Sequence, residues 1–201
     1  MFRSTLLIVL IVLLSACGSE EIEPTSYYGN TLNEFEAVNQ HNEKFTSDDM
    51  DGKIWLVNQI FTECVTVCPP MTQHMTELTQ KLADEGLEDV GILSFTVDPD
   101  NDSPEVLSEY MSWYSPDENI EWQLMTGYEF EFIRDYALNN FKSVVKQAQD
   151  GSNQVLHGTA IYLVDENGTL IKDYTGVDAG DNKFETEEIV KDVKTMTSNL
   201  D

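Results

Sequence analysis

The feature that most constrains the fold is a pair of cysteines placed between a buried strand and a helix. Residues 53–61, KIWLVNQIF, form a short apolar run of the kind that lies in the centre of a sheet. Residues 69–84 have apolar side chains at helical spacing, and Pro69 suits the first turn of a helix. Cys64 and Cys68 lie between these segments, so both sulfurs are expected close to the N-terminus of a helix.

The alternation of strand and helix patterns continues along the chain. The expected strands cover residues 90–97, 121–125, 159–164 and 169–174, the expected helices residues 104–114, 128–138 and 183–197, and the expected hairpins residues 32–46 and 144–157. This order predicts one α/β domain with a mixed central sheet flanked by helices, an N-terminal β-hairpin, and a hairpin inserted before His157 that turns at residues 149–152. A dithiol between the first buried strand and the following helix is the arrangement of a thioredoxin-like fold.

Residues 1–16 predict a lipoprotein signal peptide. One basic residue, Arg3, is followed by an apolar run at residues 6–14, which is shorter than the roughly 20 residues that span a bilayer. Small residues then precede Cys17, and the tetrapeptide LSAC resembles the bacterial lipobox, in which the cysteine becomes the lipidated N-terminus. The alternative is an uncleaved N-terminal helix.

The segment after the signal peptide and the charge of the chain define its expected surroundings. Residues 17–30 are polar and acidic and predict a lipidated flexible tether, and residues 31–201 predict the thioredoxin-like domain. We expect the protein outside the cytoplasm, anchored by lipid to a bacterial membrane on its periplasmic side. With 37 acidic and 11 basic side chains the net charge is −26, which repels nucleic acid and anionic lipid alike. We therefore expect no nucleic-acid partner, and membrane attachment through the lipid.

With Cys17 consumed by lipid, Cys64 and Cys68 are the free thiols. A helix N-terminus stabilises a thiolate, which is both a nucleophile and a metal ligand, so position alone does not separate a redox pair from a metal site. Redox thioredoxins use C-x-x-C, whereas Cys-Val-Thr-Val-Cys has one more residue, which widens the loop and suits chelation. Two thiolates favour copper or zinc over magnesium or calcium, and a metal site needs a third ligand.

Three histidines could supply that ligand. His41 lies in a polar hairpin turn and His74 on a helix surface, and both are expected to be solvated. His157 directly precedes the predicted strand at residues 159–164, whose entering loop faces the dithiol in a thioredoxin-like sheet. Disulfide-exchanging thioredoxins place a cis-proline there, but all six prolines of this chain lie at or before Pro116. This pattern favours a metal site over general disulfide exchange.

Three segments together resemble the Sco/SenC family of copper-binding proteins, over roughly Leu32 to the C-terminus. They are IFT before Cys64 with CPPMT from Cys68, the run SFTVDPDNDSP at residues 94–104, and His157 followed by YLVDENG. The C-x-x-x-C-P segment, the V-D-P-x-x-D segment and the late histidine are the signatures of that family, in order.

The resemblance implies a membrane-tethered protein that binds one copper ion, Cu(I) or Cu(II), through Cys64, Cys68 and His157. Such proteins assist assembly of the binuclear copper centre of cytochrome c oxidase, either by delivering copper to the subunit that receives it or by reducing the cysteines of that subunit to thiols. Many relatives have proline after the first cysteine, whereas this chain has Val65, which should loosen the loop without removing a ligand.

Two carboxylates of the V-D-P-x-x-D segment have open roles. Asp98 could orient His157 or act as a weak fourth ligand, or it could stabilise the turn before the next helix. For Asp102 we expect a helix cap, and Ser103 is a second candidate for that cap.

The alternative function is a thiol-disulfide oxidoreductase that acts on extracytoplasmic protein cysteines, with Cys64 and Cys68 as its catalytic redox pair. A peroxide-reducing relative is disfavoured, because the chain lacks the Pro-x-x-x-Thr-x-x-Cys arrangement of such enzymes.

Overall fold

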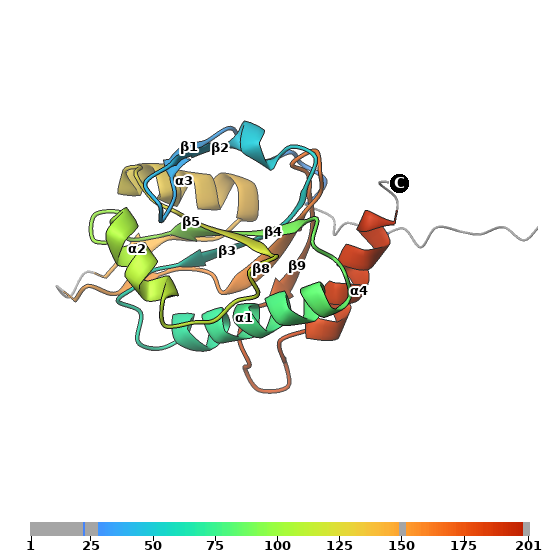
Figure 1. The fold of residues 1–201 in the computed structure, drawn as a ribbon. Helices are drawn as coiled ribbons and strands as arrows, with labels where there is room; N and C mark the ends of the chain where they lie inside the picture. The colour runs from blue at the N-terminus through green and yellow to red at the C-terminus, as the bar shows by residue number, and fades with distance from the viewer. Residues whose placement is uncertain (1–21, 23–27, 149–151, 199–201) are drawn as a thin grey trace, which may run out of the picture.

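A five-stranded mixed sheet forms the centre of the structure, a computed structural model that describes residues 22, 28–148 and 152–198 (Figure 1). In spatial order its strands are β5 (Glu121–Met125), β4 (Val90–Thr96), β3 (Ile54–Ile60), β8 (Ala160–Val164) and β9 (Leu170–Thr175). Strands β3, β4 and β5 are parallel, while β8 runs antiparallel to β3 and β9 antiparallel to β8. The predicted fold class, a thioredoxin-like mixed sheet between helices, is confirmed.

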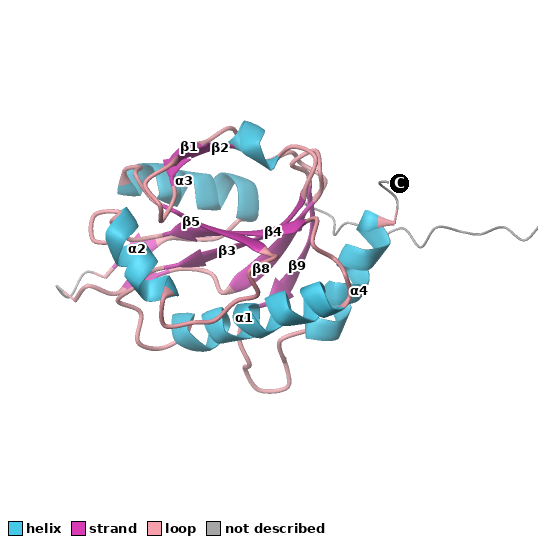
Figure 2. Ribbon diagram, viewed as in Figure 1, coloured by secondary structure: helices cyan, strands magenta, loops and turns pink. Residues whose placement is uncertain are grey.

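Helices cover both faces of this sheet (Figure 2). Helices α1 (Cys68–Asp84) and α4 (Thr186–Thr197) lie on one face, and α3 (Phe130–Phe141) lies on the other beside the hairpin of β1 (Glu36–Val38) and β2 (Lys44–Thr46). A short 3-10 helix, η1 (Ser47–Met50), follows β2, and α2 (Pro104–Met111) lies at the β5 side of the sheet. In the described residues, no helix combines the length and the apolar content of a membrane span.

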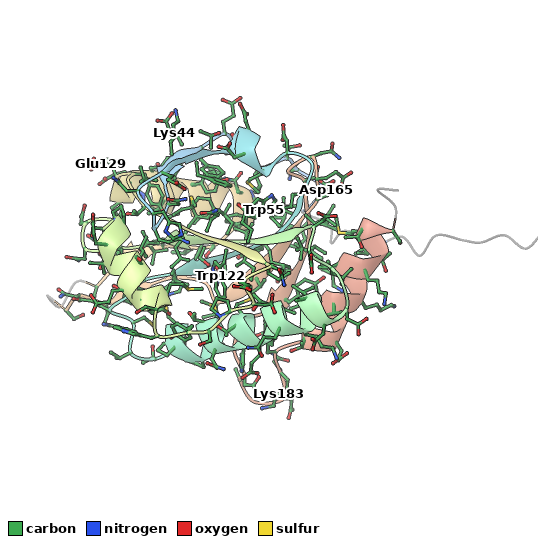
Figure 3. The ribbon with its side chains drawn as sticks, in the orientation of Figure 1. Lys44, Trp55, Trp122, Glu129, Asp165 and Lys183 are labelled. Atoms are coloured by element: carbon green, nitrogen blue, oxygen red, sulfur yellow. The ribbon has the colours of Figure 1, made fainter. Side chains whose placement is uncertain are left out.

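The central strand β3 explains why the sheet is covered on both sides. All seven of its residues are buried, because helices or hairpins cover both faces of the sheet here. A strand in this position therefore cannot alternate between apolar and solvent-exposed polar side chains. Trp55 packs its ring edge-on against Phe45 of β2, and Figure 3 shows Trp55 and Trp122 in the interior. The neighbouring strand has glycine where Trp55 crosses it: a Cβ on Gly91 would lie 2.4 Å from the Trp55 ring.

Several predicted boundaries differ from the structure. The helix expected over residues 128–138 begins at Phe130 and continues to Phe141, where Lys142 ends it in the left-handed conformation with φ 54°. The helix expected to reach Tyr114 ends at Met111. The inserted hairpin is present, but its strands β6 (Lys146–Gln147) and β7 (Val155–Leu156) have only two residues each.

The remaining expectations on organisation lie outside the described residues. They concern the signal peptide at residues 1–16, the lipidation of Cys17, most of the tether at residues 17–30, and the turn at residues 149–151 of the inserted hairpin.

Candidate metal centre

The two cysteines lie where β3 passes into α1, as their sequence position predicts. Helix α1 begins at Cys68, and the prolines that follow have no N–H group to leave unpaired. The N–H of Cys68 does need an acceptor, and the residue at the N-cap position, Val67, has no side chain that can accept it. The sulfur of Cys64 accepts that N–H at 3.3 Å, so it takes the place of a capping oxygen. The first cysteine is thereby held against the start of the helix that the second cysteine opens.

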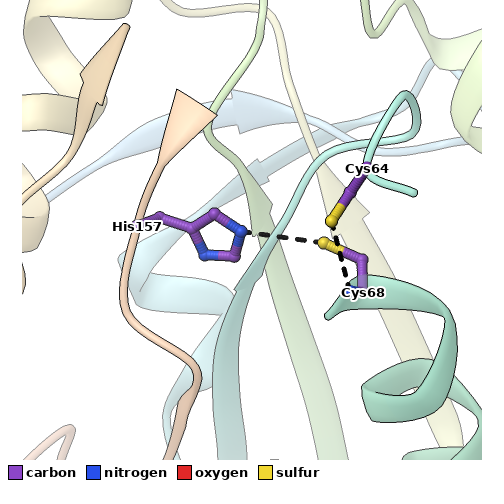
Figure 4. A group of neighbouring side chains, drawn as sticks. All are labelled: Cys64, Cys68 and His157. Carbon is purple, nitrogen blue, oxygen red and sulfur yellow. Dashed lines mark hydrogen bonds between the residues drawn. The ribbon is translucent and has the colours of Figure 1, made fainter. Parts of the chain in front are cut away.

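His157 reaches the sulfurs from the inserted hairpin, directly after β7 (Figure 4). Its Nε2 lies 3.6 Å from the Sγ of Cys68. Its Nδ1 lies 2.7 Å from the carbonyl oxygen of Gly158. Because a carbonyl oxygen only accepts, Nδ1 carries the proton in this contact, and the lone pair of Nε2 faces the sulfurs. Phe61 packs edge-on against the imidazole, with ring centroids 5.6 Å apart.

Both sulfurs are shielded from solvent, and each one shifts the pKa of the other. Cys64 is 5% exposed and Cys68 is fully buried. The hydrogen bond from the Cys68 thiol is the largest reason why the pKa of Cys64 is lowered, to about 3. The same hydrogen bond, together with burial, raises the pKa of Cys68. Cys64 is therefore the sulfur of the pair that loses its proton more readily.

The three predicted donors come together in a geometry that fits one metal ion. The two Sγ atoms and a ring nitrogen of His157 all lie within 4.8 Å of one another. Three donors in a trigonal arrangement at about 2.0–2.3 Å from one ion lie about 3.5–4.0 Å from one another, so binding requires a contraction of at most about 1 Å. Two sulfurs and one imidazole nitrogen are donors for copper or zinc and poor donors for magnesium or calcium.

Asp98 does not join this group. Its carboxylate is 4% exposed and accepts both of its hydrogen bonds from the side-chain amide of Asn101, at 2.9 and 3.1 Å. Its backbone carbonyl accepts the N–H groups of Asn101 and Asp102. These contacts match the turn-stabilising alternative. The other ring nitrogen of His157 is occupied by Gly158, so the structure does not show Asp98 orienting the imidazole. Burial raises the pKa of Asp98.

Asp102 is not the helix cap, so that expectation is wrong. The cap is Ser103, whose hydroxyl oxygen accepts the N–H of Val106 at 3.4 Å. Asp102 is instead fully buried, and its carboxylate accepts the N–H and the hydroxyl of Thr62 and the hydroxyl of Thr96. Burial raises the pKa of Asp102. This carboxylate joins the end of β4 to the loop that carries Cys64.

The other two histidines lie outside the group of donors. His41 is exposed, as predicted. His74 lies on α1 but is partly buried, which corrects the expectation of a solvated side chain. Its ring stacks on Phe184 with centroids 4.8 Å apart, and its Nδ1 lies 3.3 Å from the carbonyl oxygen of Gly176. Val65, the residue that replaces the proline of many relatives, is 80% exposed.

Two amide residues in the sequence of β3 indicate further buried hydrogen bonds that the sequence analysis did not predict. Asn58 and Gln59 are amides inside the apolar run of β3, and both are buried. A buried amide requires hydrogen-bond partners, so each predicts a polar side chain packed against β3. Those partners are Ser94 for Asn58 and Ser143 for Gln59.

A family model and a curated relative each match most of the chain. The family model described as SCO1/SenC matches residues 24–198. A protein of Bacillus subtilis described as a SCO1 protein homolog is 38% identical over 191 residues, which cover 94% of each chain.

Two solved structures are similar to this chain over most of its length. The crystal structure of a SCO1/SenC family lipoprotein from Bacillus anthracis has a TM-score of 0.76 and 39% identity, and the match covers 84% of this chain and 96% of that one. A structure of BsSco, described as a member of the Sco family of cytochrome c oxidase assembly proteins with a disulfide switch, has a TM-score of 0.75 and 35% identity. That match covers 88% of this chain and 98% of that one.

Proposed function

The chain belongs to the SCO1/SenC family, and from this premise we propose that it is a membrane-tethered protein that binds copper as its cargo in the assembly of cytochrome c oxidase. The observation that carries the proposal is the convergence of Cys64, Cys68 and His157. The relative BsSco is described as belonging to a family of cytochrome c oxidase assembly proteins, which supports cytochrome c oxidase as the enzyme whose assembly the copper serves.

Each donor has a distinct role in binding one copper ion. Cys64 offers a thiolate before the metal arrives, because the Cys68 thiol lowers its pKa. Cys68 loses its proton when the ion binds, so binding releases about one proton from the pair. His157 offers the lone pair of Nε2, which the Gly158 carbonyl keeps free by holding the proton on Nδ1. The buried position of both sulfurs excludes water from the bound ion.

A second candidate function is the reduction of disulfides in partner proteins. It is favoured by the thiolate of Cys64 lying in hydrogen-bond contact with the thiol of Cys68. Cys64 would attack a partner disulfide and release one partner thiolate. Cys68 would then displace the second partner sulfur, leaving a Cys64–Cys68 disulfide and a reduced partner dithiol. Oxidised sulfurs cannot hold copper, so the two functions use the same residues in alternative states.

The lipid anchor is part of the same proposal. Residues 1–16 would be removed, Cys17 would be lipidated, and the domain would lie on the periplasmic side of a bacterial membrane. A similar protein of Bacillus anthracis is described as a lipoprotein. The described chain joins the domain beside β9, where the N–H of Gly29 bonds to the carbonyl of Leu170. Leu170 begins β9 at the end of the sheet opposite the donors, so a tether entering there leaves the site accessible to a partner.

The test is copper loading of the purified full chain, with a thiol count before and after. We expect one copper per chain, two thiols that become unreactive on loading, and an intense sulfur-to-Cu(II) absorption. The double variant Cys64→Ser/Cys68→Ser should lose all three, while His41→Ala should retain them. Copper bound equally well by the double variant would contradict the proposal. Reduction of a protein disulfide by the metal-free dithiol would support the second function, and Cys17→Ala should release the protein from membranes.

A further inference from the structure

The imidazole of His157 is supported by a buried serine that comes from a different part of the chain. Ser143 lies between α3 and β6 and is 6% exposed. Its hydroxyl donates to the Oε1 of Gln59 at 2.9 Å, and its oxygen accepts the N–H of Gly158 at 3.2 Å. Gly158 is the residue whose carbonyl holds the Nδ1 proton of His157. A continuous series of hydrogen bonds therefore runs from the central strand to the ring.

Packing at Gly158 shows that the contact with Ser143 is close and specific. A Cβ on residue 158 would lie 2.6 Å from the Ser143 oxygen, which is closer than real Cβ contacts allow. The backbone of Gly158 does not have the positive φ that would itself require glycine. Glycine at position 158 is therefore explained by the close contact with Ser143 and not by a special backbone conformation.

The hydrogen bonds begin at Gln59, whose buried position is unfavourable for an amide side chain. Gln59 lies in the central strand β3 and is 2% exposed. Its Oε1 accepts from Ser143, but its Nε2 is buried with no hydrogen-bond partner in the part of the chain that the structure describes. A buried amide with one unpaired half is unfavourable compared with an apolar residue. Its position suits an acceptor that orients Ser143.

We propose that Ser143, anchored on Gln59, is a positioning residue that fixes the backbone of Gly158 through its N–H, so that the Gly158 carbonyl stays in place for the Nδ1 proton of His157 and Nε2 turns toward the cysteine sulfurs. This inference rests on the proposed copper-binding function of the site. The support is needed because the hairpin that leads to His157 has strands of only two residues. Without Ser143, the N–H of Gly158 loses its acceptor, so the backbone that presents the Gly158 carbonyl to Nδ1 is held less firmly.

The chain offers a matched control on the opposite face of the same strand. Ser94 donates to the Oδ1 of Asn58 at 2.5 Å and accepts the indole N–H of Trp122 at 2.9 Å. It is therefore a buried serine that joins an amide of β3 to an N–H group, as Ser143 does. Asn58 and Gln59 are adjacent, so their side chains point to opposite faces of the sheet. Ser94→Ala removes a similar pair of hydrogen bonds and has no contact with the donors.

The first measurement uses the metal-free full chain, with ¹⁵N-labelled histidine and NMR of the ring nitrogens. In the wild type we expect His157 as the Nδ1–H tautomer. Ser143→Ala should give a mixture of tautomers, whereas Ser94→Ala should leave the His157 signals unchanged. The second measurement is Cu(II) affinity, where Ser143→Ala should lose about 10–100-fold, as changes next to a metal-ligating histidine do, and Ser94→Ala should lose none.

Two further variants distinguish the positioning role of Ser143 from a loss of protein stability and from a steric clash at residue 158. Gln59→Leu removes the acceptor of Ser143 together with the unpaired Nε2, so it should fold well and still broaden the His157 tautomer signal. Gly158→Ala should disturb the ring by its clash with the Ser143 oxygen. The double variant Gly158→Ala/Ser143→Ala relieves that clash but should not restore the tautomer, because the hydrogen bond is gone.

Unchanged tautomer and copper affinity in Ser143→Ala would overturn the inference, and so would equal changes in Ser94→Ala. If the wild type bound no copper through its thiolates, the proposed function would fail, but the tautomer measurement on the metal-free chain would still decide the role of Ser143.

Discussion

Cys64 and Cys68 lie on one continuous loop and helix start, whereas His157 reaches the same point from 89 residues beyond Cys68. The sulfurs are buried and packed against the first turn of α1. The imidazole is only partly buried and follows a hairpin of two-residue strands. The sulfur half is thus part of the folded core, and the imidazole half is added to it by a few specific contacts.

The supports of the two halves differ in the same way. A buried carboxylate, Asp102, joins the cysteine loop to β4 through three donor groups. The imidazole half depends on two single hydrogen bonds, one from the Gly158 N–H to the Ser143 oxygen and one from Nδ1 of His157 to the Gly158 carbonyl. Three donor groups on one buried acceptor hold the cysteine loop more firmly than single hydrogen bonds hold the ring. Loss of a sulfur donor should therefore reduce copper binding more than loss of the imidazole does.

The largest effect is expected from Cys68→Ser. This change removes a buried donor and also the thiol that stabilises the Cys64 thiolate. Copper affinity should fall by more than about 100-fold, because changes at residues next to a ligand already reduce affinity by up to about that factor. Competition titration with a copper chelator measures this loss, and Val65→Ala, at an exposed position of the same loop, is the control. Wild-type affinity in Cys68→Ser would show that the sulfurs do not hold the ion.

A smaller loss is expected from His157→Ala. Both sulfurs remain, so copper should still bind, with an affinity reduced by about 100-fold, the upper end of the range for residues next to a ligand, and with an altered sulfur-to-Cu(II) absorption. The same competition titration and the absorption spectrum measure the change, and His74→Ala is the control, because His74 lies outside the group of donors. An affinity loss as large as that of Cys68→Ser would remove the distinction between the two halves.

The support of the sulfur half is tested by Asp102→Asn across a range of pH. Burial raises the pKa of Asp102 above its value in the unfolded chain, so its stabilising contribution is complete below about pH 4 and is lost as pH rises through the folded-state pKa. The free energy of unfolding of the wild type, relative to that of the variant, should therefore decrease with rising pH. Urea unfolding at a series of pH values measures this difference. Ser103→Ala, which removes the non-titrating helix cap, should cost about 1 kcal/mol at every pH, and a flat difference for Asp102→Asn would contradict the argument.

The smallest effect on copper is expected from Thr62→Val. The change removes one hydroxyl donor to Asp102 and leaves the backbone N–H in place. Unfolding should become easier by about 1–3 kcal/mol, while copper affinity changes by less than about tenfold. Thermal unfolding and competition titration measure the two quantities, and Thr62→Ser, which keeps the hydroxyl, should behave as the wild type. If copper affinity fell more in Thr62→Val than in His157→Ala, the hydrogen bonds of the cysteine loop would matter more for copper binding than the histidine does.

Much of this arrangement was predictable because it depends on neighbours in the sequence. The apolar run of β3, the start of α1 beside Pro69 and the four-residue step from Cys64 to Cys68 are local patterns, and the structure agrees with all three. The position of His157 before β8 followed from the order of the elements. The role of Asp102 was predicted wrongly, because a carboxylate before a helix has the pattern of a cap whether it turns outward or into the core.

The sequence by itself determined the order of strands and helices, the place of the dithiol at a helix start, and the family to which the motifs point. Hydrophobic periodicity and helix-end chemistry act within a few residues, so they can be read along the chain. Only the tertiary structure decided which polar side chains hold the donors in place. Thr62 meets Asp102 across 40 residues and Gln59 meets Ser143 across 84, and such contacts follow from how the elements pack and not from any local pattern.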